Sequence, residues 1–326
     1  MISTRKKKKI NKNIIDLIDS EDDFLIATHV QPDGDGIGAI LAFSQLLSAL
    51  KKTFTIAVGR NVVPPQYHFL PGVDTLPAEP KKEAHNVFVA LDAANKNRLG
   101  KMASVLDLCS NSINIDHHPD NSEFAAENWI DSSTSSASEQ VFDLWKSMTV
   151  PLTKAAATCI YVGMLTDTGR WQYSNTTPKT LRVAAELVDL GVSPVDVFNK
   201  VYENYSFEWF KLLAVGMKKA VFDKNTGLVY TYIELKDLAE TGAKMEETES
   251  LVDLLRSVGS VNVAMVTKET KPGEIKVSLR SRKPVDVGKL ARDFGGGGHM
   301  NAAGFVSTEP LNAIVEKVTR WLTAYS

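Results

Sequence analysis

The sequence has few cysteines and no long apolar run, and each absence excludes a class of protein. Cys109 and Cys159 are the only cysteines in 326 residues, so a disulfide-rich secreted domain is excluded. Two isolated cysteines in apolar contexts are typical of reduced, packed thiols. No apolar stretch has the length needed to cross a bilayer, and polar residues follow the basic segment Arg5–Lys9 where a signal peptide would have its apolar core. The sequence therefore predicts a cytoplasmic protein without a membrane partner.

The sequence also has almost no excess charge of either sign. The 37 Lys and Arg residues nearly balance the 39 Asp and Glu residues, and the formal net charge is −2. A protein that follows long nucleic acid along its phosphates needs a basic face, so no long duplex partner is expected. Arg5–Lys9 is interpreted as a solvated terminus, with an electrostatic role as the alternative. No aromatic-rich RNA-binding motif appears. Any nucleic-acid ligand is therefore expected to be short.

A chain of 326 residues suits two domains, and the first of them shows an alternation of apolar strands and helices. Such an alternation predicts an α/β fold, with a parallel sheet covered by helices on both faces. The expected strands are Phe24–Val30, Phe54–Val58, Val87–Leu91 and Ser112–Ile115, and the expected helices are Lys12–Asp19, Ile37–Leu50, Arg98–Leu108, Ser135–Ser147 and Thr153–Leu165.

A helical connector is expected over residues 175–220, because Thr177-Pro178 and Ser193-Pro194 are typical helix starts. A smaller α/β domain is predicted after a boundary near residues 205–220, and the two domains are set at residues 1–205, with the helical connector, and 206–326. Its expected strands are Leu228–Ile233, Val261–Thr267 and Glu274–Leu279, and its expected helices are Glu247–Val258, Val285–Phe294 and Pro310–Ala324.

Acidic side chains and histidines follow the predicted strands, at the edge where open α/β sheets bind ligands. Clustered carboxylates repel one another unless cations neutralise them, and carboxylate oxygens with imidazole suit Mn²⁺ or Mg²⁺ better than a sulfur-rich zinc site does. Taken alone, Pro-Asp-Gly-Asp-Gly is equally typical of an ordinary loop, so the metal-site interpretation depends on four segments together. The side chains are His29, Asp33, Asp35, Asp92, Asp116, His117 and His118 after strands, and Asp167 after a helix.

A run of four glycines is the main feature of the second domain. Glycines expose backbone N–H groups, which favours an anion-binding concavity, and nearby guanidinium groups suit phosphate. A flexible linker with surface arginines is the alternative, but four residues between a helix and a strand are too few for a linker. The expected substrate-binding residues are Gly295, Gly296, Gly297, Gly298, His299, Asn301, Arg280 and Arg282.

These segments resemble a known family over residues 20–325. The segment Phe294–Gly304 is similar to the signature of the DHH-associated domain, and with Ser278–Ser281 it resembles the two-domain bacterial NrnA branch. Arg170 and Met300 are less usual for that branch, and neither is a ligand position. The acidic segments resemble the four motifs of the DHH phosphoesterase superfamily: His29-x-x-x-Asp33-Gly-Asp35, Asp92, Asp116-His117-His118 and Thr166-Asp167-Thr168-Gly169.

The resemblance implies a parallel-sheet DHH domain that holds two Mn²⁺ ions, or Mg²⁺ in their place. Asp92 is then a bridging ligand with a catalytic role. His118 is expected to face the substrate or to protonate the leaving oxygen, while Asp116 orients an imidazole. The implied ligands of one ion are His29, Asp33 and Asp92, and those of the other are Asp35, Asp92, His117 and Asp167.

The resemblance also implies the activity. Members of the branch hydrolyse short single-stranded RNA of about two to five residues to mononucleotides, and they remove the 3′-phosphate of adenosine 3′,5′-bisphosphate. A homodimer is left open. One alternative is a phosphodiesterase for linear or cyclic signalling dinucleotides. A family-II inorganic pyrophosphatase shares the first four motifs, but the Gly-His signature and its arginines favour a nucleotide. A non-catalytic nucleotide-sensing module is disfavoured, because every expected metal ligand is present.

Overall fold

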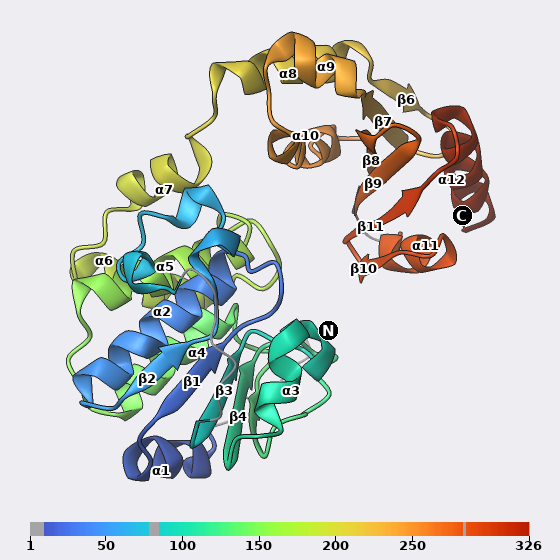
Figure 1. Ribbon diagram of the computed structural model, residues 1–326. Helices are drawn as coiled ribbons and strands as arrows, with labels where there is room; N and C mark the ends of the chain where they lie inside the picture. The colour runs from blue at the N-terminus through green and yellow to red at the C-terminus, as the bar shows by residue number, and fades with distance from the viewer. Residues whose placement is uncertain (1–9, 78–84, 283–284, 326) are drawn as a thin grey trace. The chain divides into compact units, whose positions relative to one another are not determined.

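The computed structural model describes residues 10–77, 85–282 and 285–325. The chain divides into two compact units, Met1–Asn204 and Tyr205–Ser326 (Figure 1). The basic segment Arg5–Lys9 lies outside the described residues. Within the described ranges, no helix combines the length and the apolar character that a bilayer crossing requires.

The first unit is built on the predicted parallel sheet, and the α/β fold class is confirmed. All neighbouring strands are parallel, in the order β2-β1-β3-β4-β5. The edge strand β5 was not predicted, because Trp129 is its one buried residue and so it shows little apolar pattern. The strands are β1 (Phe24–Ala27), β2 (Phe54–Ile56), β3 (Val87–Leu91), β4 (Asn111–Asp116) and β5 (Glu127–Ile130).

Helices cover both faces of this sheet, which explains why its central strands are continuously apolar. Phe24 and Ile26 of β1 join the core formed with α2, α4 and α5. Leu25 and Ala27 point to the other face, where η4 and α3 pack (Figure 1). The helices and 3-10 turns are α1 (Lys12–Ser20), α2 (Gly34–Ala49), η1 (Arg60–Val62), η2 (Pro65–Tyr67), η3 (Val73–Thr75), η4 (Lys96–Met102), α3 (Ala103–Leu106), α4 (Ala137–Ser147), α5 (Lys154–Asp167), α6 (Pro178–Asp189) and α7 (Pro194–Tyr202).

Two glycine-dependent features shape this unit. A Cβ atom on Gly38 of α2 would lie 2.5 Å from the carbonyl oxygen of Cys159, so glycine allows α2 and α5 to cross at short range. The single helix predicted over Arg98–Leu108 is wrong. Gly100 has a φ of 55° and a non-helical backbone that kinks the segment within η4, and α-helical structure begins only with α3.

The second unit contains a mixed six-stranded sheet in the order β10-β11-β9-β8-β7-β6. Only β7 and β8 pair in parallel among its neighbouring strands. The helix predicted over Glu247–Val258 is shorter than expected, and β6 and α9 were not predicted. The elements are α8 (Phe207–Lys218), β6 (Val221–Asp223), β7 (Leu228–Ile233), α9 (Leu235–Thr241), η5 (Met245–Thr248), α10 (Leu251–Arg256), β8 (Val263–Lys271), β9 (Glu274–Ser281), α11 (Val287–Asp293), β10 (Gly297–His299), β11 (Ala302–Ser307) and α12 (Leu311–Tyr325).

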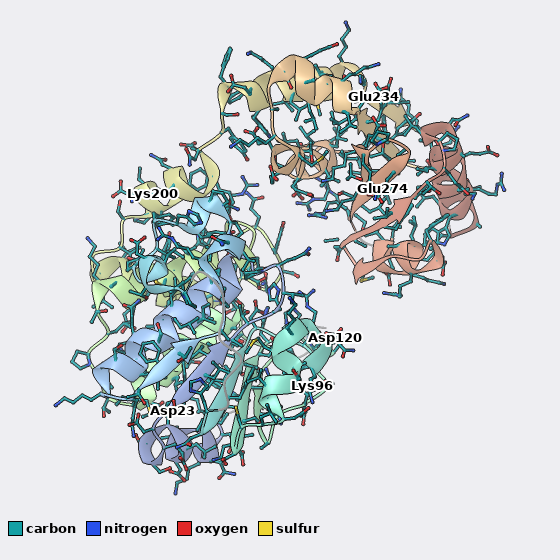
Figure 2. The ribbon with its side chains drawn as sticks, in the orientation of Figure 1. Asp23, Lys96, Asp120, Lys200, Glu234 and Glu274 are labelled. Atoms are coloured by element: carbon teal, nitrogen blue, oxygen red, sulfur yellow. The ribbon has the colours of Figure 1, made fainter. Side chains whose placement is uncertain are left out.

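The outer surfaces carry most of the charge. Figure 2 labels charged side chains such as Asp120 and Glu274, and neither of these is buried. Asp35, Asp92 and Asp116 are different, because they are 1%, 3% and 0% exposed. Buried carboxylates are costly unless hydrogen bonds or cations compensate their charge, so these three residues mark the candidate site.

Candidate functional site

The structure gathers every predicted metal-ligating side chain of the first unit at the carboxyl edge of its sheet. The loop after β1 supplies His29, and β3 and β4 lead into Asp92 and Asp116-His117-His118. Asp167 is the last residue of α5. The potential ligand atoms form three overlapping groups, within each of which they all lie within 4.8 Å of one another: His29, Asp33 and Asp92; Asp35, His117 and Asp167; and Asp92, Asp116, His117 and His118.

In the first group, one ring nitrogen of His29 faces two carboxylates. His29 Nε2 lies 3.8 Å from Asp33 Oδ1 and 3.5 Å from Asp92 Oδ2. Its other nitrogen, Nδ1, lies 2.8 Å from the carbonyl oxygen of Val30 and 3.2 Å from Arg98 Nη2. Burial opposes charge on the ring, yet the carboxylates raise the pKa of His29 to about 10. A cation that binds Nε2 must therefore displace a proton.

Local turn chemistry places the first carboxylate. Asp33 is the N-cap of α2, and its Oδ1 accepts hydrogen bonds from the N–H groups of Asp35 (3.0 Å) and Gly36 (3.1 Å). A Cβ atom on Gly36 would lie 2.6 Å from Thr28 Oγ1, so glycine lets the first turn of α2 lie against the end of β1. The Asp-Gly-Asp-Gly sequence therefore both starts the helix and turns its carboxylates toward the sheet edge.

The second group surrounds His117. Its Nε2 lies 3.6 Å from Asp167 Oδ2, 3.7 Å from Asp92 Oδ1 and 4.0 Å from Asp35 Oδ2. This nitrogen is buried and has no hydrogen-bond partner among the described residues. An unpartnered imidazole nitrogen that faces three carboxylates at these distances fits a cation bound between them.

Electrostatics supports the same fit. Burial, together with the neighbouring charge of Asp92, raises the pKa of Asp35 and of Asp167 well above the usual aspartate value. Carboxylates this close must either take up protons or share a cation. Two backbone donors at the start of α4 already hold Asp35: the N–H groups of Ala137 (2.7 Å) and Ser138 (2.9 Å). The donor set of oxygens and imidazoles suits hard divalent cations.

Asp116 and His118 form a separate pair beside the two groups. Asp116 Oδ1 lies 2.8 Å from His118 Nδ1, and Asp116 Oδ2 accepts a hydrogen bond from Asn121 (2.6 Å). Burial opposes charge on the ring, but Asp116 raises the pKa of His118 to about 9. Asp92, which lies 3.7 Å from His118 Nδ1, has a φ of 56°. Such a left-handed backbone in a residue other than glycine is typical of functional sites.

Three contacts of this site were not expected from the sequence. They are the backbone donors of α4 to Asp35, the Asn121 amide on Asp116, and the Asn175 amide, which lies 3.1 Å from Asp167 Oδ2. Ser136 followed by Glu139 is a helix-start signal, and Ser136 does cap α4. That signal indicates where the helix begins, but not which side chain its first N–H groups contact.

In the second unit, β11 brings two predicted substrate-binding segments together. Ala302 of β11 pairs with Arg280 on one side and with His299 on the other. Arg280 Nε lies 3.3 Å from Asp253 Oδ1. Asn301 donates from Nδ2 to the carbonyl oxygen of Ser281 (3.2 Å). The predicted residues therefore meet at one end of this sheet.

Arg282, the remaining predicted arginine, is exposed. Its Nη1 lies 3.5 Å from the carbonyl oxygen of Gly259. Among the described residues, no carboxylate forms an ion pair with its guanidinium group. It thus differs from Arg280, which pairs with Asp253.

The expectation of four free glycine N–H groups is wrong for two of them. Gly295 donates to the carbonyl oxygen of Arg292 (3.0 Å), and Gly296 donates to that of Ala291 (2.8 Å). Gly297 and Gly298 belong to β10. A Cβ atom on Gly296 would lie 2.2 Å from the carbonyl oxygen of Gly304, so close packing of strands explains part of the glycine run.

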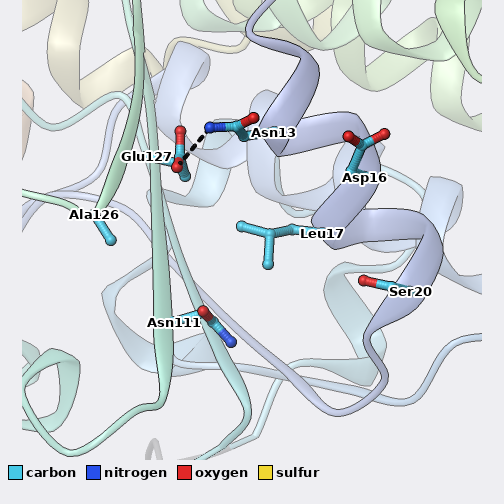
Figure 3. A pocket seen from close by; sticks show the side chains of 7 residues that line it. All are labelled: Asn13, Asp16, Leu17, Ser20, Asn111, Ala126 and Glu127. Atoms are coloured by element: carbon cyan, nitrogen blue, oxygen red, sulfur yellow. Dashed lines mark hydrogen bonds between the residues drawn. The ribbon is translucent and has the colours of Figure 1, made fainter.

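A hollow of about 310 Å³ lies elsewhere on the first unit, beside α1 (Figure 3). Asn13 donates across it to Glu127 Oε1 at 2.9 Å. Asn111 and Glu127, which line it, are the first residues of β4 and β5. The hollow is therefore at the amino ends of the strands, opposite the carboxylate cluster.

Comparison with known families agrees with this architecture. The DHH family N-terminal domain matches residues 23–164, and the DHHA1 domain matches residues 225–324. The bifunctional oligoribonuclease and PAP phosphatase NrnA of Thermus thermophilus is 34% identical over 283 residues, covering 86% of this chain and 82% of the relative. The Bacillus subtilis protein of the same name is 30% identical, covering 89% and 91%.

Solved structures show the same fold. An exopolyphosphatase-related protein from Bacteroides fragilis has a TM-score of 0.89 and 26% identity, and the match covers 96% of this chain and 95% of that one. Exonuclease RecJ bound to manganese has a TM-score of 0.56 at 14% identity, covering 99% and 96%, and thus shares the fold.

The fold and the carboxylate–histidine cluster together define a metal-dependent phosphoesterase of the DHH type with a DHHA1 domain. Within that class, the chain belongs to the NrnA family and is a hydrolytic enzyme. The resemblance stated from the sequence is confirmed.

Proposed function

We propose that this enzyme uses two divalent cations to hydrolyse short oligoribonucleotides to mononucleotides and to remove the 3′-phosphate of adenosine 3′,5′-bisphosphate. The observation that carries the two-cation proposal is the position of Asp92. Its Oδ2 lies 3.5 Å from His29 Nε2, and its Oδ1 lies 3.7 Å from His117 Nε2. The carboxylate of Asp92 thus points one oxygen at the first group and its other oxygen at the second group. The names of the NrnA relatives support the substrates.

Each of the two groups would hold one ion. Mn²⁺ is proposed for both, with Mg²⁺ as the alternative, and the manganese-bound RecJ structure supports this choice. When bound, paired divalent cations activate water and offset the charge that develops on the phosphoryl oxygens. The proposed ligands are His29, Asp33 and Asp92 for one ion, and Asp35, Asp92, His117 and Asp167 for the other.

His118 is the proposed general acid. Asp116 holds its Nδ1 at 2.8 Å, which orients the ring and stabilises its charged form. Asp116 thus raises the pKa of His118, which favours the protonated imidazole that a general acid needs. We assign the Nε2 proton to the leaving oxygen of the scissile phosphate.

The two neighbouring histidines are expected to respond differently to substitution. His118→Ala should keep its metal content and lose turnover by about 10²- to 10⁴-fold, as expected for loss of a general acid. His117→Ala should lose affinity for one ion, since its Nε2 faces three carboxylates. Elemental analysis after dialysis and kcat measure both effects. A metal-deficient His118→Ala beside a metal-replete His117→Ala would show that the roles are exchanged.

The second unit is proposed to bind the nucleotide. Its candidate residues are those that the sequence predicted, with Arg280 as the principal phosphate ligand. Its side chain is 30% exposed, and its guanidinium group is held by Asp253, so it is partly ordered before a phosphate arrives. The near-neutral net charge of −2 favours short RNA over long chains. A cytoplasmic location and a homodimer remain predictions, and light scattering would test the second.

Arg280→Ala is expected to lower kcat/KM on two- to five-mers by at least about tenfold, since one charge-assisted hydrogen bond to phosphate is lost. Hydrolysis of a minimal activated phosphodiester should stay nearly unchanged. Arg320→Ala is the matched control, because this arginine of α12 is 73% exposed and pairs with Glu316. If Arg280→Ala lowers both activities by the same factor, the second unit does not select the nucleotide.

One assay tests the proposed function directly. The purified protein with Mn²⁺ is incubated with a ladder of two- to ten-mers, adenosine 3′,5′-bisphosphate, cyclic dinucleotides and pyrophosphate. Short RNA and the bisphosphate should be consumed. Preferential hydrolysis of signalling dinucleotides or of pyrophosphate would contradict the proposal, and absence of any hydrolysis would favour a nucleotide-sensing module.

A further inference from the structure

The side-chain amide of Asn175 connects two parts of the metal centre. Its Nδ2 lies 3.1 Å from Asp167 Oδ2 and 3.2 Å from the carbonyl oxygen of the same residue. It also donates to the carbonyl oxygen of Ser135 at 2.9 Å. One amide group thus links the carboxylate at the end of α5 to the residue before the N-cap of α4.

The Ser135 end of this link is firmly held. Glu139, which is 0% exposed, accepts hydrogen bonds at Oε2 from the N–H (3.1 Å) and the Oγ (2.6 Å) of Ser135. Thr180 Oγ1 donates to the same oxygen at 2.8 Å, and Lys179 Nζ lies 2.8 Å from Oε1 and balances the charge. The acceptor of the Asn175 amide is therefore part of a buried network in which Ser135 and Thr180 donate to Glu139.

The first turn of α4, which follows Ser135 directly, holds a second carboxylate. The N–H groups of Ala137 and Ser138 donate to the two oxygens of Asp35. Asp35 and Asp167 face the same nitrogen of His117, at 4.0 Å and 3.6 Å. The segment Ser135–Ser138 at the start of α4 therefore contacts Asp35 directly and Asp167 through Asn175.

We infer that Asn175 is a positioning residue, which holds the carboxylate of Asp167 at a set distance from Asp35 so that both can bind one cation. The inference rests on the proposed two-cation function. Carboxylates around an ion repel one another before it binds, and fixed donors counter this repulsion. Hydrogen bonds to metal ligands typically change metal affinity by about 10- to 100-fold.

Isothermal titration of the metal-free full chain with Mn²⁺ tests this role. Asn175→Ala is expected to lower the affinity of one of the two sites by about 10- to 100-fold, while the Tm of the metal-free protein stays close to that of the control. Asn128→Ala is a suitable control, because the Asn128 amide bonds to both backbone groups of Ala125 and to no proposed ligand. If Asn175→Ala does not fold, Asn175→Ser replaces it, since its shorter hydroxyl does not reach both acceptors.

A double-mutant cycle shows whether the effect passes through Asp167. Asn175→Ala should cause no further loss of Mn²⁺ affinity once Asp167 is alanine. Unchanged affinity in Asn175→Ala would overturn the inference, and so would a loss at both sites in step with a lower metal-free Tm. If the wild-type chain does not bind Mn²⁺, the proposed two-cation function is wrong, and this inference is wrong as well. Failure of the inference alone leaves wild-type binding intact.

Discussion

Asp92→Ala is expected to lower kcat by at least about 10³-fold, because a shared ligand supports both sites that act in one step. It should also lose more bound Mn²⁺ than His29→Ala does. The reason is geometric: Asp92 faces His29 with Oδ2 and His117 with Oδ1, whereas His29 belongs to one group only among those formed by the described residues. Elemental analysis after dialysis and single-turnover kinetics measure the two effects.

Asp107→Ala is the control for this experiment. Asp107 is 59% exposed and pairs with Lys96, so its removal should change neither metal content nor kcat. A metal-free Tm for Asp92→Ala close to that of the wild type would separate loss of a ligand from loss of the fold. Equal metal content in Asp92→Ala and the wild type would refute the bridging assignment.

Gly163→Ala is expected to have the second large effect, although Gly163 carries no functional group. An added Cβ atom would lie 2.0 Å from Ser138 Oγ and 2.8 Å from Asp35 Oδ1. Either the start of α4 moves away, or Asp35 leaves its two backbone donors. Overpacking of this kind costs about 1–3 kcal/mol, and a displacement near 1 Å at a catalytic centre can cost about 10²-fold in rate.

The measurements for Gly163→Ala are kcat, Mn²⁺ affinity and Tm. We expect all three to fall, with kcat lowered by about 10²-fold. Gly259→Ala is the matched control, because a Cβ atom there meets no described atom within 4 Å. Wild-type Mn²⁺ affinity in Gly163→Ala would mean that α4 adjusts without disturbing Asp35, and would contradict the expected coupling.

Local patterns predicted most of the first unit. The buried strands β1 and β3 are continuously apolar, and Asp33 caps α2 within its own turn, so both can be recognised over a few residues. Where the local pattern is weak, prediction failed. Strand β5 has one buried residue, and Gly100 interrupts a segment that was predicted as one helix. Just before β10, the packing of Gly296 against Gly304 depends on how β10 and β11 pair, which the glycine run alone does not reveal.

By itself, the sequence determined the α/β class, the family and the identity of the carboxylates and imidazoles that follow the strands. These features depend on residue type and on short spacings. Only the tertiary structure decided how the side chains are held. Asp35 accepts hydrogen bonds from residues 102 and 103 positions away, and Asn175 reaches back 40 residues to Ser135. Such contacts form because helices α2, α4 and α5 pack at particular distances, which glycines such as Gly163 set through the absence of a side chain. A local pattern contains no information on that packing.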